Sequence, residues 1–194
     1  VMKGLIIKSG GIIRGRNQYY RGSVTTTEYL ENDGAIGGYI YSVESGGVII
    51  NNGIINTDEF YIREGNLSML GNYVIAPKLL GDISLTSNLI LTTPLHSGGH
   101  NIDSNNHSIQ IHGFTGSGTI TGSSTIHVKG NGNGQVLVEG LDASQSDILI
   151  LSDGLRLSNN ISGHTIEFSK PVYLDGASQT ITGDVTLQNS ASIY

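Results

Sequence analysis

The chain has 194 residues, no cysteine and a formal net charge of −6, from 10 basic and 16 acidic side chains. The lack of thiols excludes cysteine nucleophiles, thiolate metal sites and disulfides, and the acidic balance argues against a nucleic-acid partner. Because no apolar run reaches the roughly 18 residues of a membrane span, we expect no membrane-spanning segment.

Residues 1–46 differ in composition from the rest of the chain. They hold five of the nine tyrosines, together with three arginines. Tyr and Arg are favoured anchors at protein interfaces, but capping the first unit of a repeat array would use the same residue types. We therefore predict an atypical N-terminal cap or junction here. Its interface candidates are Arg14, Arg16, Tyr19, Tyr20, Arg21, Tyr39 and Tyr41.

Residues 47–194 repeat a short motif of alternating apolar residues followed by Gly, Asn, Ser or Asp. The motif recurs at 48–50, 67–69, 83–85, 109–111, 126–128, 148–150, 166–168 and 185–187. A strand-length unit that returns at about 20 residues is typical of a stacked solenoid, in which one unit cannot bury its own apolar face. We predict an all-β fold, a right-handed parallel β-helix (β-solenoid) with coils of about 20 residues. A β-sandwich is the main structural alternative.

The steps between motifs are uneven, and the longest runs from 83 to 109. It contains a Gly-rich and His-rich segment at 96–107. We predict that this segment protrudes from one coil as a loop that is free to contact a partner. Its candidate residues are His96, His100, Asp103 and His107.

Two segments, residues 95–111 (LHSGGHNIDSNNHSIQI) and 175–187 (DGASQTITGDVTL), show the coil-and-turn pattern of bacterial surface β-helices. The chain from 47 to 194 resembles autotransporter passengers and filamentous-haemagglutinin-like adhesins in its style of repeat. The resemblance implies a secreted or surface-displayed rod used for adhesion or as a stalk. It supplies no active-site residues.

Polar residues leave three chemical alternatives. His112 and His127 would bind a metal if they stacked on adjacent coils. Acidic turns, which include Asp142, Asp147, Asp153, Asp175 and Asp184, would bind calcium, although the nonapeptide of calcium-binding β-rolls is missing. Polysaccharide cleavage would need Asp142 or Asp147 to align with Glu167, and nothing pairs Arg156 with that set. We expect no catalytic residues, no metal site and no cofactor, with calcium as the alternative.

Together these patterns predict a non-enzymatic, extracellular or cell-surface rod of a secreted bacterial protein, adhesive or structural. Its expected partners are a host or cell-surface glycan or protein, or copies of itself. One alternative is a glycan-binding or glycan-cleaving β-helix of the phage tailspike type, and another is a subunit of an end-to-end filament. The chain starts at Val1 and ends within an apolar stretch, so we expect it to be part of a longer protein.

Overall fold

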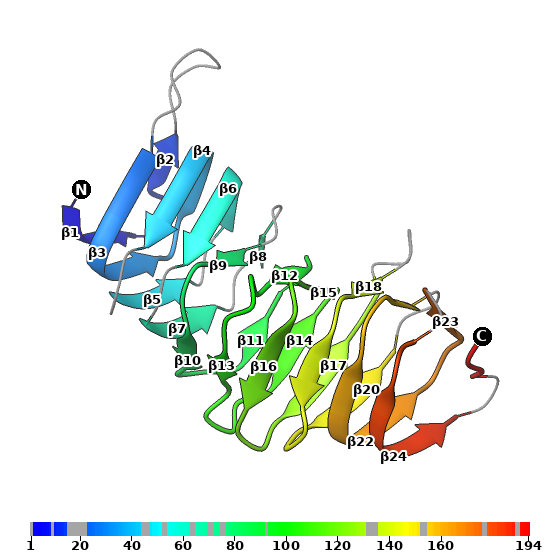
Figure 1. Ribbon diagram of the computed structural model, residues 1–194. Helices are drawn as coiled ribbons and strands as arrows, with labels where there is room; N and C mark the ends of the chain where they lie inside the picture. Colours follow the sequence, from blue (N-terminus) through cyan, green and yellow to red (C-terminus); the bar gives the residue numbers. More distant parts are fainter. Residues whose placement is uncertain are drawn as a thin grey trace.

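The computed structural model describes residues 2–8, 10–14, 23–43, 47–51, 54–62, 65–69, 72–73, 77–91, 93–130, 136–151, 155–175, 178–188 and 191–194. Within these ranges the only regular elements are β-strands (Figure 1). The strands lie side by side along an elongated molecule whose two termini are at opposite ends. No helix in these ranges is long and apolar enough to cross a membrane.

Three parallel sheets run through successive coils, and a further ladder of strands lies towards the N-terminus. The first sheet contains β1 (Met2–Ile7), β3 (Ser23–Asn32), β5 (Gly47–Asn51), β7 (Gly65–Met69), β10 (Ile83–Leu85), β13 (Ile102–Asp103), β16 (Gly118–Thr121), β19 (Leu141–Ala143) and the starts of β22 (Ile161–Phe168) and β24 (Ile181–Leu187).

The second sheet contains β11 (Leu89–Ile90), β14 (Ile109–Ile111), β17 (Thr125–Val128), β20 (Asp147–Ile150) and the ends of β22 and β24. The third contains β9 (Lys78–Leu79), β12 (Leu95–His96), β15 (Phe114–Thr115), β18 (Leu137–Val138), β21 (Leu155–Leu157) and β23 (Val172–Leu174). Towards the N-terminus, β2 (Ile12–Arg14), β4 (Ala35–Val43), β6 (Ile54–Ile62) and β8 (Asn72–Tyr73) form a further ladder, which joins the third sheet where β6 pairs with β9.

Every one of these strand pairings is parallel, and partner residues lie about one coil apart in sequence. In the first sheet, Ile83 pairs with Ile102, and Ile102 pairs with Ile120 on the coil after that. In the second sheet, five successive pairings join β11 to β24. The predicted parallel β-solenoid is therefore confirmed, and the antiparallel β-sandwich alternative is wrong for this chain.

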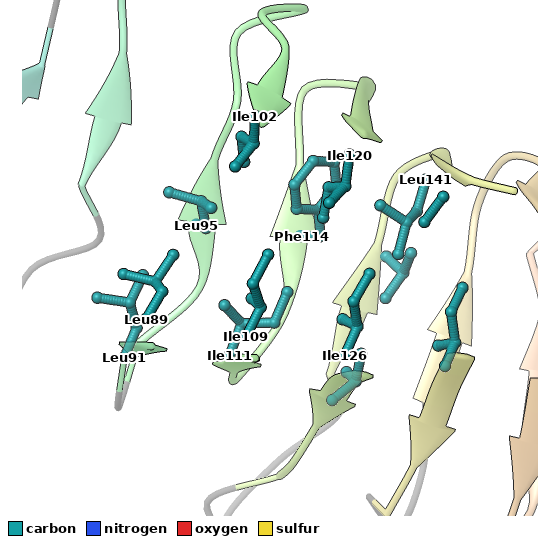
Figure 2. Packing of buried hydrophobic residues seen from close by; sticks show 14 of the residues in the cluster. Leu89, Leu91, Leu95, Ile102, Ile109, Ile111, Phe114, Ile120, Ile126 and Leu141 are labelled. Carbon is teal, nitrogen blue, oxygen red and sulfur yellow. The ribbon is translucent and has the colours of Figure 1, made fainter. Parts of the chain in front are cut away.

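The core is a set of aliphatic columns that run along the molecule between the sheets. Because side chains alternate across a strand, β14 turns Ile109 and Ile111 inward and Gln110 outward. Figure 2 shows side chains of successive coils in rows. One column is Leu89, Ile109, Ile126, Ile148 and Ile166, each exposed by 1% or less. Each coil thus buries its apolar face on its neighbours, and burial of one such side chain stabilises the fold by about 1.5–3 kcal/mol.

Small polar residues mark the corners where the chain turns between sheets. Asn105 and Asn106 adopt positive φ angles of 51° and 62°, a conformation that Asn tolerates better than most residues. The buried Ser146 donates its hydroxyl to the carbonyl of Gly122 on the preceding coil, at 2.9 Å. Such contacts satisfy buried polar groups at a corner without interrupting the ladders.

The segment 96–107 does not protrude, which corrects the expectation of a loop bulging from one coil. His96 and Asp103 lie in β12 and β13, and both strands pair in register with the coils on either side. The long apparent step has a simple cause: the motif at 83–85 belongs to the first sheet, whereas the motif at 109–111 belongs to the second. The interval between these two motifs therefore compares two different faces of the solenoid.

Candidate functional site: polar grooves at the coil corners

The described surface is hollowed by a groove of about 460 Å³, which we name the axial groove. It lies at the corner where the third sheet turns into the first, and it crosses four consecutive coils. It is lined by Gly99, Ser117, Gly118, Thr119, Gly140, Leu141, Asp142, Asn159, Asn160 and Ser162. Since neighbouring coils rise by about 4.8 Å, the groove extends for about 14 Å along the molecule.

One wall of the axial groove is a row of outward side chains that strand register brings together. Thr119 pairs with Asp142, and Asp142 with Ser162. The Ser162 hydroxyl donates a hydrogen bond of 2.6 Å to Oδ1 of Asp142. A carboxylate has about four acceptor sites, so Asp142 keeps most of its capacity for a ligand. This wall offers one negative charge and two hydroxyls.

The last of the four coils also contributes two consecutive amides to the lining. Asn160 Oδ1 accepts the backbone N–H of Thr180 at 2.9 Å, and Asn159 Oδ1 accepts the N–H of Asn160 at 2.8 Å. Because these contacts fix both amide oxygens, the NH₂ groups are the parts of the two side chains that remain to donate. The groove therefore offers amide NH₂ donors, the Asp142 carboxylate as an acceptor, and hydroxyls that can do either.

Gly140 lines the groove and has no side chain that would project into it. Its φ is +72°, and a Cβ at this position would lie 3.1 Å from Ser117 Oγ and 3.5 Å from Asn159 Nδ2. A larger residue would strain the backbone. It would also place an atom between the side chains of Ser117 and Asn159. The glycine thus holds open the space that a ligand would occupy.

A second hollow, which we name the turn groove, has a volume of about 420 Å³ at the corner between the first and second sheets. Its acidic residue, Asp147, accepts the Thr165 hydroxyl at 2.8 Å, and Nδ1 of His164 lies 3.1 Å from the same oxygen. The Thr165 hydrogen bond, followed by that of His164, lowers the pKa of Asp147. Its lining is Asn106, Ser108, Ser123, Ser124, Thr125, Gln145, Asp147 and His164.

The predicted histidine pair is not stacked. On the outer face of the second sheet, the residue beside His127 is Gln110. The backbone N–H of Lys129 donates to the Ile111 carbonyl, which places Lys129 beside His112, and its ammonium donates to Gln110 at 2.7 Å. Burial, and then the Lys129 charge, lower the pKa of both histidines. Among the described residues, no group of three or more His, Asp or Glu side chains is placed to hold a metal ion.

The acidic set proposed for polysaccharide cleavage does not align as expected. Asp142 lies in the first sheet beside Ser162, and Glu167 lies in the second sheet beside Leu149. The neighbour of Asp147 on the next coil is Thr165, which donates to it. The expectation that Asp142 or Asp147 sits opposite Glu167 is therefore wrong.

Asp175 and Asp184, two other acidic residues considered for calcium binding, have different surroundings. Arg156 forms an ion pair of 2.6 Å with Asp175, a contact the sequence did not predict. Asp184 is exposed in β24, where it pairs with Thr165. Asp153 lies outside the described residues.

The interface candidates are only partly covered by the described ranges. Arg14 lies in β2, and Tyr39 and Tyr41 lie in β4, whereas Arg16, Tyr19, Tyr20 and Arg21 lie outside these ranges. Strands of this N-terminal segment pair in parallel with the coils that follow. Its role as a cap or contact surface stays a prediction.

The candidates of segment 96–107 take part in contacts along the solenoid. His96 Nδ1 lies 2.7 Å from the Thr115 hydroxyl, and His100 lies 3.8 Å from Asp82. Asp103 accepts the backbone N–H of Asn105 at 3.0 Å, and His107 donates its own backbone N–H to Ser104. Contact with a partner stays a prediction for all four.

Sequence reasoning misses most of the axial groove. The pattern singles out Asp142 only as a catalytic or calcium-binding candidate, and it does not single out Thr119, Asn159 or Ser162. A signal does exist: Thr119, Asp142 and Ser162 each stand beside an inward aliphatic residue of the first sheet. Their spacing along the chain follows the length of the coils.

The fold and its surface define the class of this protein as a parallel β-solenoid with grooves at the coil corners. Comparisons with protein-family models, curated proteins and solved structures match nothing to this chain.

Proposed function

We propose that this protein is a non-enzymatic binding rod, displayed outside the cell or on its surface, whose grooved side contacts a glycan or a glycoprotein. The observation that carries the proposal is the row of Thr119, Asp142 and Ser162 on consecutive coils, in the groove that Asn159 and Asn160 also line. A ladder fixed by backbone hydrogen bonds holds these side chains at a regular spacing, which suits an extended ligand. The style of repeat supports a place among bacterial autotransporter-like or filamentous-haemagglutinin-like adhesins.

Adhesion of protein-coated beads tests this function. Beads coated with the chain should be retained on a mucin layer more strongly than beads coated with an unrelated protein of similar charge. Equal retention on mucin, on deglycosylated mucin and on the uncoated surface would contradict a binding role.

The same layers, assayed for released reducing ends, distinguish binding from cleavage. We expect no release above that of a buffer control, because the proposed role is non-catalytic. A sustained release of reducing ends would overturn that role in favour of a glycan-cleaving β-helix.

One specific observation favours a second candidate, end-to-end association of copies into a filament. Val185 and Leu187 of β24 continue the core columns of Ile166 and Phe168, yet they are 44% and 48% exposed. At the other end, Leu5 of β1 continues the core column of Leu30 and is only partly buried. Because all coils stack in parallel, the β24 edge of one copy and the β1 edge of another form a head-to-tail contact that repeats along one axis.

Charge reversal at this edge tests the filament. The wild-type chain should show a mass in light scattering that rises with protein concentration, and Val185→Lys should lower it to that of one chain. Gln188→Lys is the matched control, since Gln188 is exposed on the same end without continuing a core column. A wild-type chain that stays monomeric at all concentrations would sink the filament alternative.

A further inference from the structure

We infer that the axial groove binds a neutral, linear oligosaccharide lying parallel to the solenoid axis, with about one sugar residue on each coil. This inference rests on the proposed binding function and assigns its ligand class and its residues. The axial groove is larger than the turn groove, and its polar groups come from consecutive turns.

The match of spacing is the first argument. Parallel coils rise by about 4.8 Å, which is close to the length of one pyranose residue in an extended chain. The spacing of Thr119, Asp142 and Ser162 on consecutive coils is therefore close to the length of one sugar residue of such a chain. A groove that crosses four coils has room for about three such residues.

The chemistry of the walls is the second argument. A sugar hydroxyl both donates and accepts, so hydroxyls of a glycan in the groove can donate to Asp142 and accept from the NH₂ groups of Asn159 and Asn160. The Asn orientations are set by hydrogen bonds to Thr180 and Asn160, and Asp142 is held by Ser162. The groups are thus oriented before a ligand arrives, which lowers the entropic cost of binding.

Other ligand classes fit the groove less well. A peptide strand would need an unpaired sheet edge or an apolar groove. Here the strands of the groove are paired on both sides, so no sheet edge is open to a peptide. An anionic ligand such as a phosphate or a sulfated glycan would meet the Asp142 carboxylate and a chain of net charge −6. A neutral glycan avoids both penalties.

Titration calorimetry with neutral oligosaccharides tests the inference. The probes are linear β-1,4-linked glucose and mannose chains and linear α-1,6-linked glucose chains, each from disaccharide to hexasaccharide. For the series that binds, affinity should rise with length up to about three or four residues and then level off, because the groove ends. A lack of binding by all three series would overturn the inference.

Groove variants identify the binding surface. Asp142→Ala should weaken the binding of the oligosaccharide by roughly 10- to 100-fold, since a hydrogen bond to a charged group is lost. Asn159→Ala should weaken it by roughly 3- to 10-fold. Asp184→Ala is the matched control, because Asp184 is an exposed carboxylate outside the axial groove, and it should bind as the wild type does.

A fold check and a steric variant keep these results interpretable. The circular dichroism spectrum and melting temperature of Asp142→Ala should match those of Asp184→Ala; if Asp142→Ala does not fold, Asp142→Asn replaces it. Gly140→Ser, which fills the space between Ser117 and Asn159, should abolish binding. Unchanged affinity in Asp142→Ala and Asn159→Ala would place the glycan elsewhere and overturn the assignment.

The bead assay separates the failure of this inference from the failure of the proposed function. Wild-type beads that adhere to mucin while Asp142→Ala beads adhere equally well would leave the binding rod standing and reject the groove as its site. Beads that fail to adhere, with no oligosaccharide bound, would reject both.

Discussion

At the scale of single residues, Asp147 gives the solenoid a defined acid sensitivity. Its pKa lies below the ordinary value of 3.8 because Thr165 and His164 hydrogen-bond to its carboxylate. The unfolded chain therefore binds the proton at a higher pH than the folded chain does. The stability that this carboxylate contributes is present above pH 3.8 and is lost as the pH falls through its lower folded pKa.

Asp147→Asn tests this contribution. At pH 7 the variant should melt at a slightly lower temperature than the wild type, with a small difference because the side chain is exposed. The difference should close as the pH falls below 3.8, where the wild-type carboxyl becomes protonated. Asp184→Asn, a change at another exposed carboxylate, is the control, and a wild-type advantage that persists unchanged at the lowest pH would contradict the assignment.

At the scale of an element, β20 shows how one strand serves both core and surface. Ile148 points inward and is fully buried, whereas the next residue, Leu149, points outward beside His127 and Glu167.

Ile148→Ala should lower the free energy of unfolding by about 2–5 kcal/mol, because it leaves a cavity between two coils. Leu149→Ala, a matched aliphatic change, should cost about 1 kcal/mol or less. Urea unfolding followed by circular dichroism measures both, and equal costs would show that the strand's orientation is misassigned.

The outer face of the second sheet should add a second pH response near neutrality. The pKa values of His112 and His127 lie below the ordinary 6.5, through burial and the charge of Lys129. Their contribution to stability is therefore complete above pH 6.5 and declines as the pH falls towards their folded pKa values. The midpoint of urea unfolding should decrease over this range.

The double variant His112→Gln/His127→Gln should flatten that decrease, since it removes both titrating groups. His107→Gln, which lies outside this outer face, should leave it unchanged. An equally steep decrease in the double variant and the wild type would show that other groups cause the response.

At the scale of the whole molecule, much of the architecture could be predicted from the sequence. Inward residues such as Ile126 and Ile148 recur at about one coil length, and such a recurrence buries apolar surface only if the coils stack. The organisation of segment 96–107 was predicted wrongly, because its flanking motifs belong to different sheets. Periodicity shows that a strand exists without showing which sheet it joins.

The sequence by itself determined the class of fold, because alternating aliphatic residues and turn-forming glycines and asparagines act locally. Only the tertiary structure decided which surface residues are neighbours. Turn lengths vary between coils, so the stretch of chain from Thr119 to its partner Asp142 is longer than the stretch from Asp142 to its partner Ser162. The hydrogen-bond register of the ladder, rather than sequence spacing, brings these side chains together, and the axial groove exists because of that register.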